Sequence, residues 1–197
     1  MDADLYQIVI SRSNINPFKR YLEYLHDLNE LTGEEKALCN TIGREFIGVI
    51  ETTNMSKVYK MPVLMAFYNK GQMRMALTEE ELLVSWKEFF GNGTNWKDLD
   101  RSLTYEEYQA ISDRDHIKKI MQMPVHFLQE SGKGFFIKKE GYALALREEL
   151  ETVIHDPVFV SHVKDVIDYR TMDYYQRRYV EQKQTLSTAT GGVYEDS

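Results

Sequence analysis

The sequence predicts a mainly helical α+β protein, and three observations lead to that fold class. Apolar residues recur at helical spacing over long segments, and only four prolines and eleven glycines interrupt the 197 residues. One segment, 134–146, instead holds two short apolar runs around a glycine, which is typical of a β-hairpin. With 43% hydrophobic residues the chain can bury a sizeable core. We therefore expect a helical hairpin, a winged-helix-like centre with a β-hairpin wing, and a long C-terminal helix.

Residues 1–50 are predicted to form the N-terminal helical hairpin. A short strand around 5–10 is one alternative for the first residues, and the tail of a preceding domain is another. Asn16-Pro17 has the residue types of an N-cap and first helical position, and predicts a helix through Leu31 that ends at Gly33. The apolar stripe over 34–50 predicts a second helix, and the short link makes the two antiparallel.

Residues 51–156 are predicted to form the winged-helix-like domain. A helix is expected from Ser56 or Lys57, with Pro62 in its first two turns and a closing turn at 69–71. After an extended piece over 72–75, Thr78 and Glu81 form a capping box before the next helix. The polar stretch 91–113 is read as an insertion with a short helix at 104–111.

The second half of this domain supplies the wing. A helix over 115–128 should break or kink at Pro124, and a turn at 131–134 should lead into a hairpin with Glu140-Gly141 at its tip. A short helix is expected over 147–154. Asp156-Pro157 then opens a last helix, predicted to pack on the domain over 157–183, and the Thr, Ser and Gly content of 184–197 predicts a disordered tail.

Composition favours a cytoplasmic protein. The single cysteine, Cys39, cannot form a disulfide within the chain, which suits a reducing compartment. The N-terminus lacks the basic and apolar regions of a signal peptide, and no apolar run approaches the roughly 18 residues of a membrane span. We therefore expect no membrane partner.

No enzyme signature is visible in the sequence. Gly132-Lys133-Gly134 is the nearest approach to a phosphate-binding loop, but it lacks the first glycine, the hydroxyl and the helix. The five histidines are scattered, without the spacing of a zinc site. Lys138-Lys139-Glu140 reverses the order of a restriction-type nuclease motif. We expect no catalytic residue, metal or cofactor, and no enzymatic activity of this chain by itself.

Charge along the chain points to binding instead. The total is −7, yet block 51–77 carries +3 and block 114–147 carries +4, and these blocks coincide with the predicted basic helix and wing. Lysines on a wing and its preceding helix would meet nucleic-acid phosphates, and two arginines near the end of the last helix could add to them. The candidate nucleic-acid-binding residues are Lys57, Lys60, Lys70, Arg74, Lys118, Lys119, Lys133, Lys138, Lys139, Arg177 and Arg178. Arg147 also belongs to the second block.

Three segments carry a resemblance to a known family. They are Glu51 through Leu64, then Pro124-Val125-His126-Phe127-Leu128 with Gly134-Phe135-Phe136, and His162 through Arg170 with Tyr174 and Arg177-Arg178-Tyr179. Together they make 34–182 resemble the C-terminal accessory region of bacterial DEAD/DEAH-box (superfamily 2) helicases of the restriction or defence type. Val58 stands where that family usually has serine.

The resemblance implies a non-catalytic accessory domain whose partners are DNA, duplex or single-stranded, and helicase motor domains in cis or in trans. ATP hydrolysis would then belong to the parent helicase. The alternative is a protein-docking module that couples a motor to a partner or to a second copy, using Trp86, Trp96 and the tyrosine-rich last helix.

Overall fold

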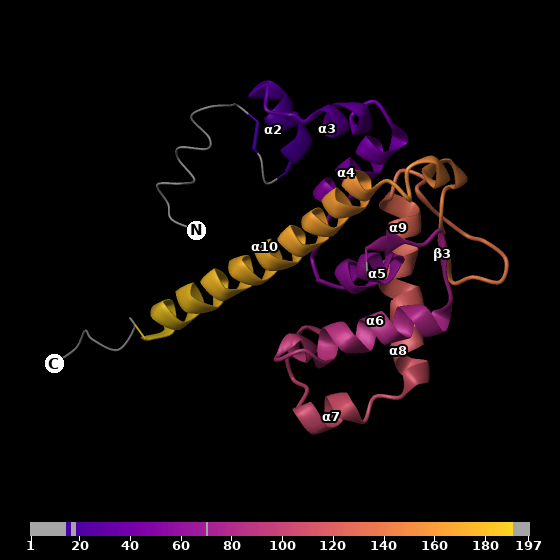
Figure 1. Cartoon of the computed structure of the whole chain (residues 1–197). Helices are drawn as coiled ribbons and strands as arrows, with labels where there is room; N and C mark the ends of the chain where they lie inside the picture. Colours follow the sequence, from indigo (N-terminus) through magenta and orange to yellow (C-terminus); the bar gives the residue numbers. More distant parts are fainter. Residues whose placement is uncertain (1–14, 17–18, 70, 191–197) are drawn as a thin grey trace.

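The structure is a computed structural model, and it describes residues 15–16, 19–69 and 71–190. The strand expected at 5–10, Pro17 of the first helix, the candidate Lys70 and residues 191–197 of the expected tail lie outside the described residues. The fold is mainly helical α+β, with a small three-stranded antiparallel sheet and a long C-terminal helix, as predicted (Figure 1). Within the described part of the chain, no helix has both the length and the apolar character needed to cross a membrane.

The described residues of the N-terminal region form three helices: α2 (Tyr21–Asp27), α3 (Gly33–Leu38) and α4 (Ile42–Thr52). The single helix predicted over 34–50 is therefore wrong, because Thr41 interrupts it and caps α4 by accepting a hydrogen bond from the amide of Gly43 at 3.1 Å. Gly33 begins α3 and does not end the preceding helix, since Thr32 and Glu35 form a capping box around it. The Thr-x-x-Glu spacing of that box is a local sequence signal for a helix start, and it outweighs the glycine as a stop signal.

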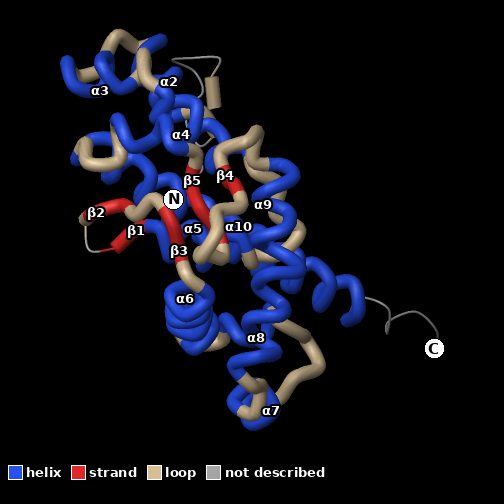
Figure 2. The backbone as a smooth tube through the Cα atoms, turned by 90° about the vertical axis from the view of Figure 1, so that its right-hand side faces the viewer, coloured by secondary structure: helices blue, strands red, loops and turns tan. Residues whose placement is uncertain are grey.

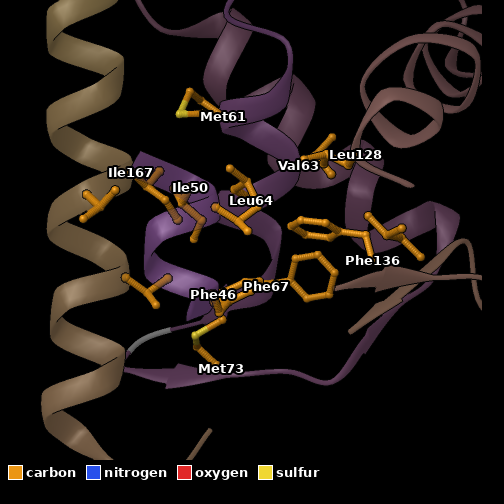
Figure 3. Close-up of a cluster of buried hydrophobic side chains, with 14 of the residues drawn as sticks. Phe46, Ile50, Met61, Val63, Leu64, Phe67, Met73, Leu128, Phe136 and Ile167 are labelled. Atoms are coloured by element: carbon orange, nitrogen blue, oxygen red, sulfur yellow. The ribbon is translucent and has the colours of Figure 1, made fainter. Parts of the chain in front are cut away.

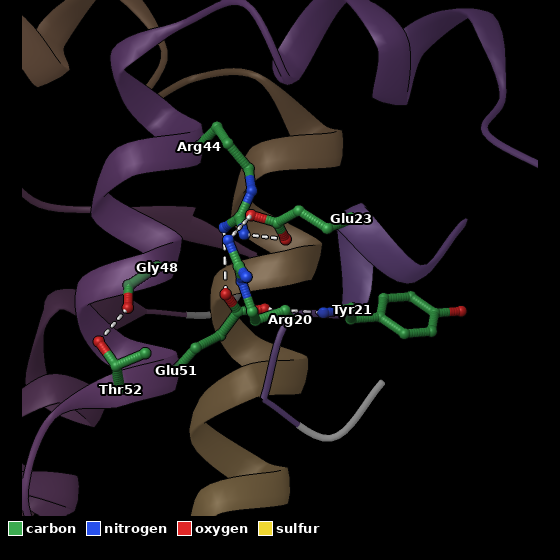
Figure 4. A network of polar contacts seen from close by, with 7 residues as sticks. All are labelled: Arg20, Tyr21, Glu23, Arg44, Gly48, Glu51 and Thr52. Atoms are coloured by element: carbon green, nitrogen blue, oxygen red, sulfur yellow. Dashed lines mark hydrogen bonds and ion pairs between the residues drawn. The ribbon is translucent and has the colours of Figure 1, made fainter. Parts of the chain in front are cut away.

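A buried polar network ties α2 to α4 (Figure 4). Arg44 donates to the Glu51 carboxylate at 3.1 Å and also pairs with Glu23 of α2. The second oxygen of Glu51 accepts from the backbone amide of Tyr21 at 3.1 Å. Glu51 is only 3% exposed, so these contacts satisfy a carboxylate that would otherwise be costly to bury.

The first half of the centre runs α5 (Lys60–Phe67), β1 (Tyr68–Asn69), β2 (Gln72–Met73), β3 (Ala76–Leu77) and α6 (Glu79–Gly91). Strands β1 and β2 pair in an antiparallel hairpin, and Gly71, which precedes β2, has a φ of 85°. The predicted capping box of α6 is confirmed: Thr78 Oγ1 accepts from the Glu81 amide at 3.2 Å, and Glu81 accepts from the Thr78 amide at 2.9 Å.

The second half begins with the insertion, which holds the 3-10 turn η1 (Asn95–Asp98) and α7 (Tyr105–Gln109). Next come α8 (Asp113–Ile120), a π-helical turn at Met121–Val125 and α9 (His126–Ser131), which lie end to end (Figure 1). The predicted break or kink at Pro124 takes the form of this π-helical turn, and the helical run continues through it. Proline has no amide hydrogen for the usual helical bond, and the chain absorbs this with one wide turn.

The wing consists of β4 (Phe136–Ile137) and β5 (Leu144–Leu146), and β5 lies between β3 and β4 in the sheet (Figure 2). Ala145 faces Ala76 on one side and Ile137 on the other. The element order helix, strand, two helices and two-stranded wing, with the last strand in the middle, is the order expected of a winged-helix-like centre. The 3-10 turn η3 (Glu148–Thr152) follows where a short helix was expected.

Helix α10 (Pro157–Thr190) packs against α3, α4, α5 and β2. Its Ile167 faces the cluster formed by Phe46, Phe67 and Phe136 (Figure 3). One connected set of buried residues runs from Leu22 to Tyr174. Helix α10 reaches Thr190, so it extends beyond the predicted 157–183 and includes 184–190 of the segment predicted to be disordered.

Candidate nucleic-acid interface

The wing is an exposed, basic hairpin held by its two ends. Gly141 at the tip has a φ of 79°, a conformation that suits glycine, and the amide of Tyr142 closes the turn on the Lys139 carbonyl at 3.1 Å. At its base, the amide of Ala143 donates to the Leu77 carbonyl of β3 at 2.8 Å. The sheet therefore holds the wing in a fixed position beside α9.

Five of the described candidate cations are exposed, and one of these, Arg177, forms an ion pair on its own helix. Lys118 on α8, Lys133 in the turn before the wing, and Lys138 and Lys139 on the wing are exposed. None of them forms an ion pair with a described residue. Lys139 lies 5.8 Å from the ring centre of Tyr142, which is 46% exposed. Sequence reasoning missed this tyrosine, although its position in the hairpin, next to the basic run, was a usable signal.

Arg147 at the base of the wing is part of the packing. Its guanidinium lies 4.5 Å from the centre of the Phe135 ring and pairs with Glu149 at 3.3 Å. Arg147 is half-buried between an aromatic ring and a carboxylate. It therefore packs at the base of the wing and does not extend the exposed basic surface.

Three other predicted cations converge on one acidic residue in the insertion, Asp98, which is 4% exposed. Arg178 of α10 pairs with its carboxylate, and Lys57 donates to its backbone carbonyl at 3.3 Å. Lys119 of α8 donates to the next carbonyl, that of Leu99, at 3.1 Å. These side chains anchor the insertion to α5, α8 and α10 and are committed to internal contacts.

Tyr59 completes this anchor, which we call the Asp98 cluster: Lys57, Tyr59, Asp98, Lys119 and Arg178. The Tyr59 hydroxyl lies 3.1 Å and 3.0 Å from the carbonyl oxygens of Asp98 and Leu99. Burial, followed by the negative charge of Asp98, raises the pKa of Tyr59 to about 12. Burial also lowers the pKa of Lys119. The cluster is structural in character, and a local charge count cannot foresee it because its members are up to 121 positions apart.

The remaining predicted cations are scattered. Arg74 pairs with Glu81 at the start of α6, and Arg177 pairs with Asp173 on its own helix at 2.9 Å. Lys60 is only 8% exposed and donates to two hydroxyl groups. The structure thus leaves Lys133, Lys138 and Lys139 exposed in the wing and the turn before it, and Lys118 exposed on a different element. The interior contacts described above are made by Lys57, Lys60, Lys119 and Arg178. Surface ion pairs are made by Arg74 and Arg177.

The described residues contain no group of three or more His, Cys, Asp and Glu side chains placed to hold a metal ion. His116 is buried and accepts from the Trp86 indole at 3.2 Å, and His162 lies 3.2 Å from Glu35. Both histidines therefore have packing partners.

The comparisons with known proteins give no family. No family model matches the chain, no curated protein matches it, and no solved structure matches it. The likeness to helicase accessory regions therefore stays a prediction from three sequence segments, and the functional argument depends on the surface described above.

Proposed function

We propose that this chain is a nucleic-acid-binding module that holds backbone phosphates with its wing. One observation carries the proposal: Lys133, Lys138 and Lys139 are exposed on a short hairpin and the turn leading into it, without acidic ion-pair partners among the described residues. The hairpin follows a helix and belongs to a three-stranded sheet, as in the predicted winged-helix-like order.

The chemistry of these side chains suits phosphate. Ammonium groups on flexible stems contact phosphate oxygens without reading bases, so binding should depend little on sequence. Tyr142 adds an exposed ring beside Lys139, and such a ring can stack on an unpaired base. The net charge of −7 disfavours contact elsewhere on the surface and would orient the nucleic acid toward the wing.

The resemblance supplies the context of the proposal. A wing of this kind would hold DNA, duplex or single-stranded, for a helicase motor in cis or in trans, while the chain itself performs no chemistry. With about three phosphate contacts, the logarithm of affinity should fall with the logarithm of salt concentration with a slope near −3.

The test measures binding of labelled duplex and single-stranded DNA by fluorescence anisotropy over a series of salt concentrations. The triple variant Lys133→Gln, Lys138→Gln, Lys139→Gln should bind both much more weakly, and its salt slope should shrink by about one for each lysine removed. Tyr142→Ala should weaken single-stranded binding more than duplex binding.

The matched control is Lys19→Gln, Lys36→Gln, Lys97→Gln, which removes the same charge from exposed positions away from the wing. It should leave the salt slope unchanged. Equal losses in the two triple variants would show that only total charge matters, and the wing would then be rejected as the contact.

A protein-docking module is the second candidate, and α10 favours it. Beyond its contacts with the core, this helix extends away from the other elements, as Figures 1 and 2 both show. Met172 and Tyr179 on it are 49% and 59% exposed. Trp86 and Trp96, expected to serve docking, are 0% and 9% exposed and belong to the core. Apolar docking should persist at high salt, whereas phosphate binding should weaken.

A further inference from the structure

A small cavity of about 250 Å³ lies between the segment that leads into α5 and the outer face of the π-helical turn and α9. Asn54, Ser56 and Ser131 give it a polar side, and Met123, Pro124 and Phe127 give it an apolar wall. Two lysines, Lys57 and Lys60, also line it, and none of its lining residues is acidic. The cavity is therefore rich in hydrogen-bond donors and has no negative charge of its own.

Lys60 is the unusual member of this set. It is 8% exposed, and its ammonium donates only to hydroxyl oxygens, of Thr53 at 3.0 Å and Ser131 at 3.4 Å. Burying an ammonium without a counter-charge is costly, so buried lysines normally meet a carboxylate or another anion. Burial, followed by the charge of Arg170, lowers the pKa of Lys60.

Arg170 of α10 lies behind this lysine and adds to the positive charge. It donates to the backbone carbonyl of Thr53, the same residue whose hydroxyl binds Lys60, and its buried Nε has no acceptor. The negative charge of Asp173 stabilises the charged form of Arg170, and the positive charge of Arg177 destabilises it. No carboxylate forms an ion pair with Lys60 among the described residues, so the cavity borders a region of uncompensated positive charge.

The ammonium of Lys57 faces another way, toward the Asp98 carbonyl, so Lys60 provides the charge at the cavity. The hydrogen-bond donors and the positive charge of the cavity both favour an oxyanion.

We propose that this cavity binds the phosphate monoester of a nucleotide. The phosphate meets Lys60 and Ser131, whose hydroxyl turns toward it from the Phe127 carbonyl that it contacts at 2.6 Å. The attached nucleoside packs against Met123 and Phe127, which are 40% and 44% exposed. The volume is below the roughly 300–1,000 Å³ of sites for drug-sized ligands, which limits the occupant to about one nucleotide. A free mononucleotide and a 5′-phosphorylated strand end present the same chemistry. The site is independent of phosphate binding by the wing.

The experiment uses the full chain carrying the wing triple variant, so that the wing lysines contribute nothing and either proposal can fail alone. Calorimetric titrations would compare inorganic phosphate, adenosine 5′-monophosphate, adenosine, and a tetranucleotide with and without a 5′-phosphate. We expect the monophosphate to bind and adenosine not to bind. Lys60→Met should weaken monophosphate binding about tenfold to hundredfold, the usual effect of losing a charge-assisted hydrogen bond.

Two further variants keep the result interpretable. Ser131→Ala removes one proposed contact at an exposed position, so folding should be retained, and it should weaken binding in the same direction. Lys36→Met on α3 is the matched control and should bind as the parent does. Tight binding of the 5′-phosphorylated tetranucleotide would identify a strand end as the source, and preference for the mononucleotide would identify a free nucleotide. Absence of binding by every phosphate probe, or equal binding in Lys60→Met and the parent, would overturn the proposal.

Discussion

The Asp98 cluster permits a sharp test of what holds the long helix on the rest of the protein. Asp98 is 4% exposed and pairs with Arg178 of α10, whose side chain is 15% exposed. The change Asp98→Asn keeps the side-chain volume and the backbone carbonyl that receives Lys57 and Tyr59. It removes the negative charge opposite Arg178 and replaces one carboxylate oxygen with an amide nitrogen.

The expected cost follows from that geometry. Removing one partner of a buried ion pair costs about 3–5 kcal/mol because the other charge stays buried without compensation. The asparagine oxygen can still accept from Arg178, and Arg178 keeps some solvent contact and its position 5.5 Å from the Tyr174 ring centre. The low end of the range, about 3 kcal/mol, is therefore expected. For a chain of this size the midpoint of thermal unfolding should fall by about 6–12 °C.

Thermal and urea unfolding followed by circular dichroism would measure the change. The second single variant, Arg178→Met, and the double variant complete a thermodynamic cycle, in which the double variant should lose less than the sum of the two. Asp113→Asn, which breaks the exposed pair of Asp113 with Lys87, is the control and should leave the midpoint unchanged. An Asp98→Asn protein within about 0.5 kcal/mol of the parent would refute the anchoring role of the cluster.

Three further outcomes are expected. Gly132→Ala should destabilise the fold by about 2–4 kcal/mol in urea unfolding, because its Cβ would overlap the Leu128 carbonyl and the Phe136 ring. The control Gly33→Ala has open space around its Cβ and should not destabilise the fold. Burial raises the pKa of Glu51, so the folded state favours its protonated form, and this group makes stability fall as pH rises from its ordinary value of 4.5 toward the folded value. The stability difference between Glu51→Gln and the parent should therefore depend on pH in that window, and a constant difference would contradict the assignment. Burial lowers the pKa of His116, so stability should fall as pH drops through 6.5, and His116→Gln should remove that dependence in unfolding curves measured between pH 5 and 8.

The candidate interface shows where sequence reasoning succeeds and where it stops. Lys133, Lys138 and Lys139 could be placed on a wing from the sequence, because the glycine-flanked hairpin and its basic run are local signals, and the structure has them exposed there. A charge count along the sequence does not distinguish these wing lysines from Lys57, Lys119 and Arg178. Their partners come from the insertion around Asp98, which is distant in the chain, so no local pattern could reveal them.

The sequence by itself determined the fold class, the α6 capping box, the break or kink at Pro124 and the hairpin, since caps, proline and turn glycines act within a few residues. Tertiary structure decided which positive side chains face solvent and which are turned inward, and it enclosed Lys60 beside the cavity at the π-helical turn. The reason is physical. The environment of a charge depends on the segments packed around it, and those segments are brought together only when the whole core forms.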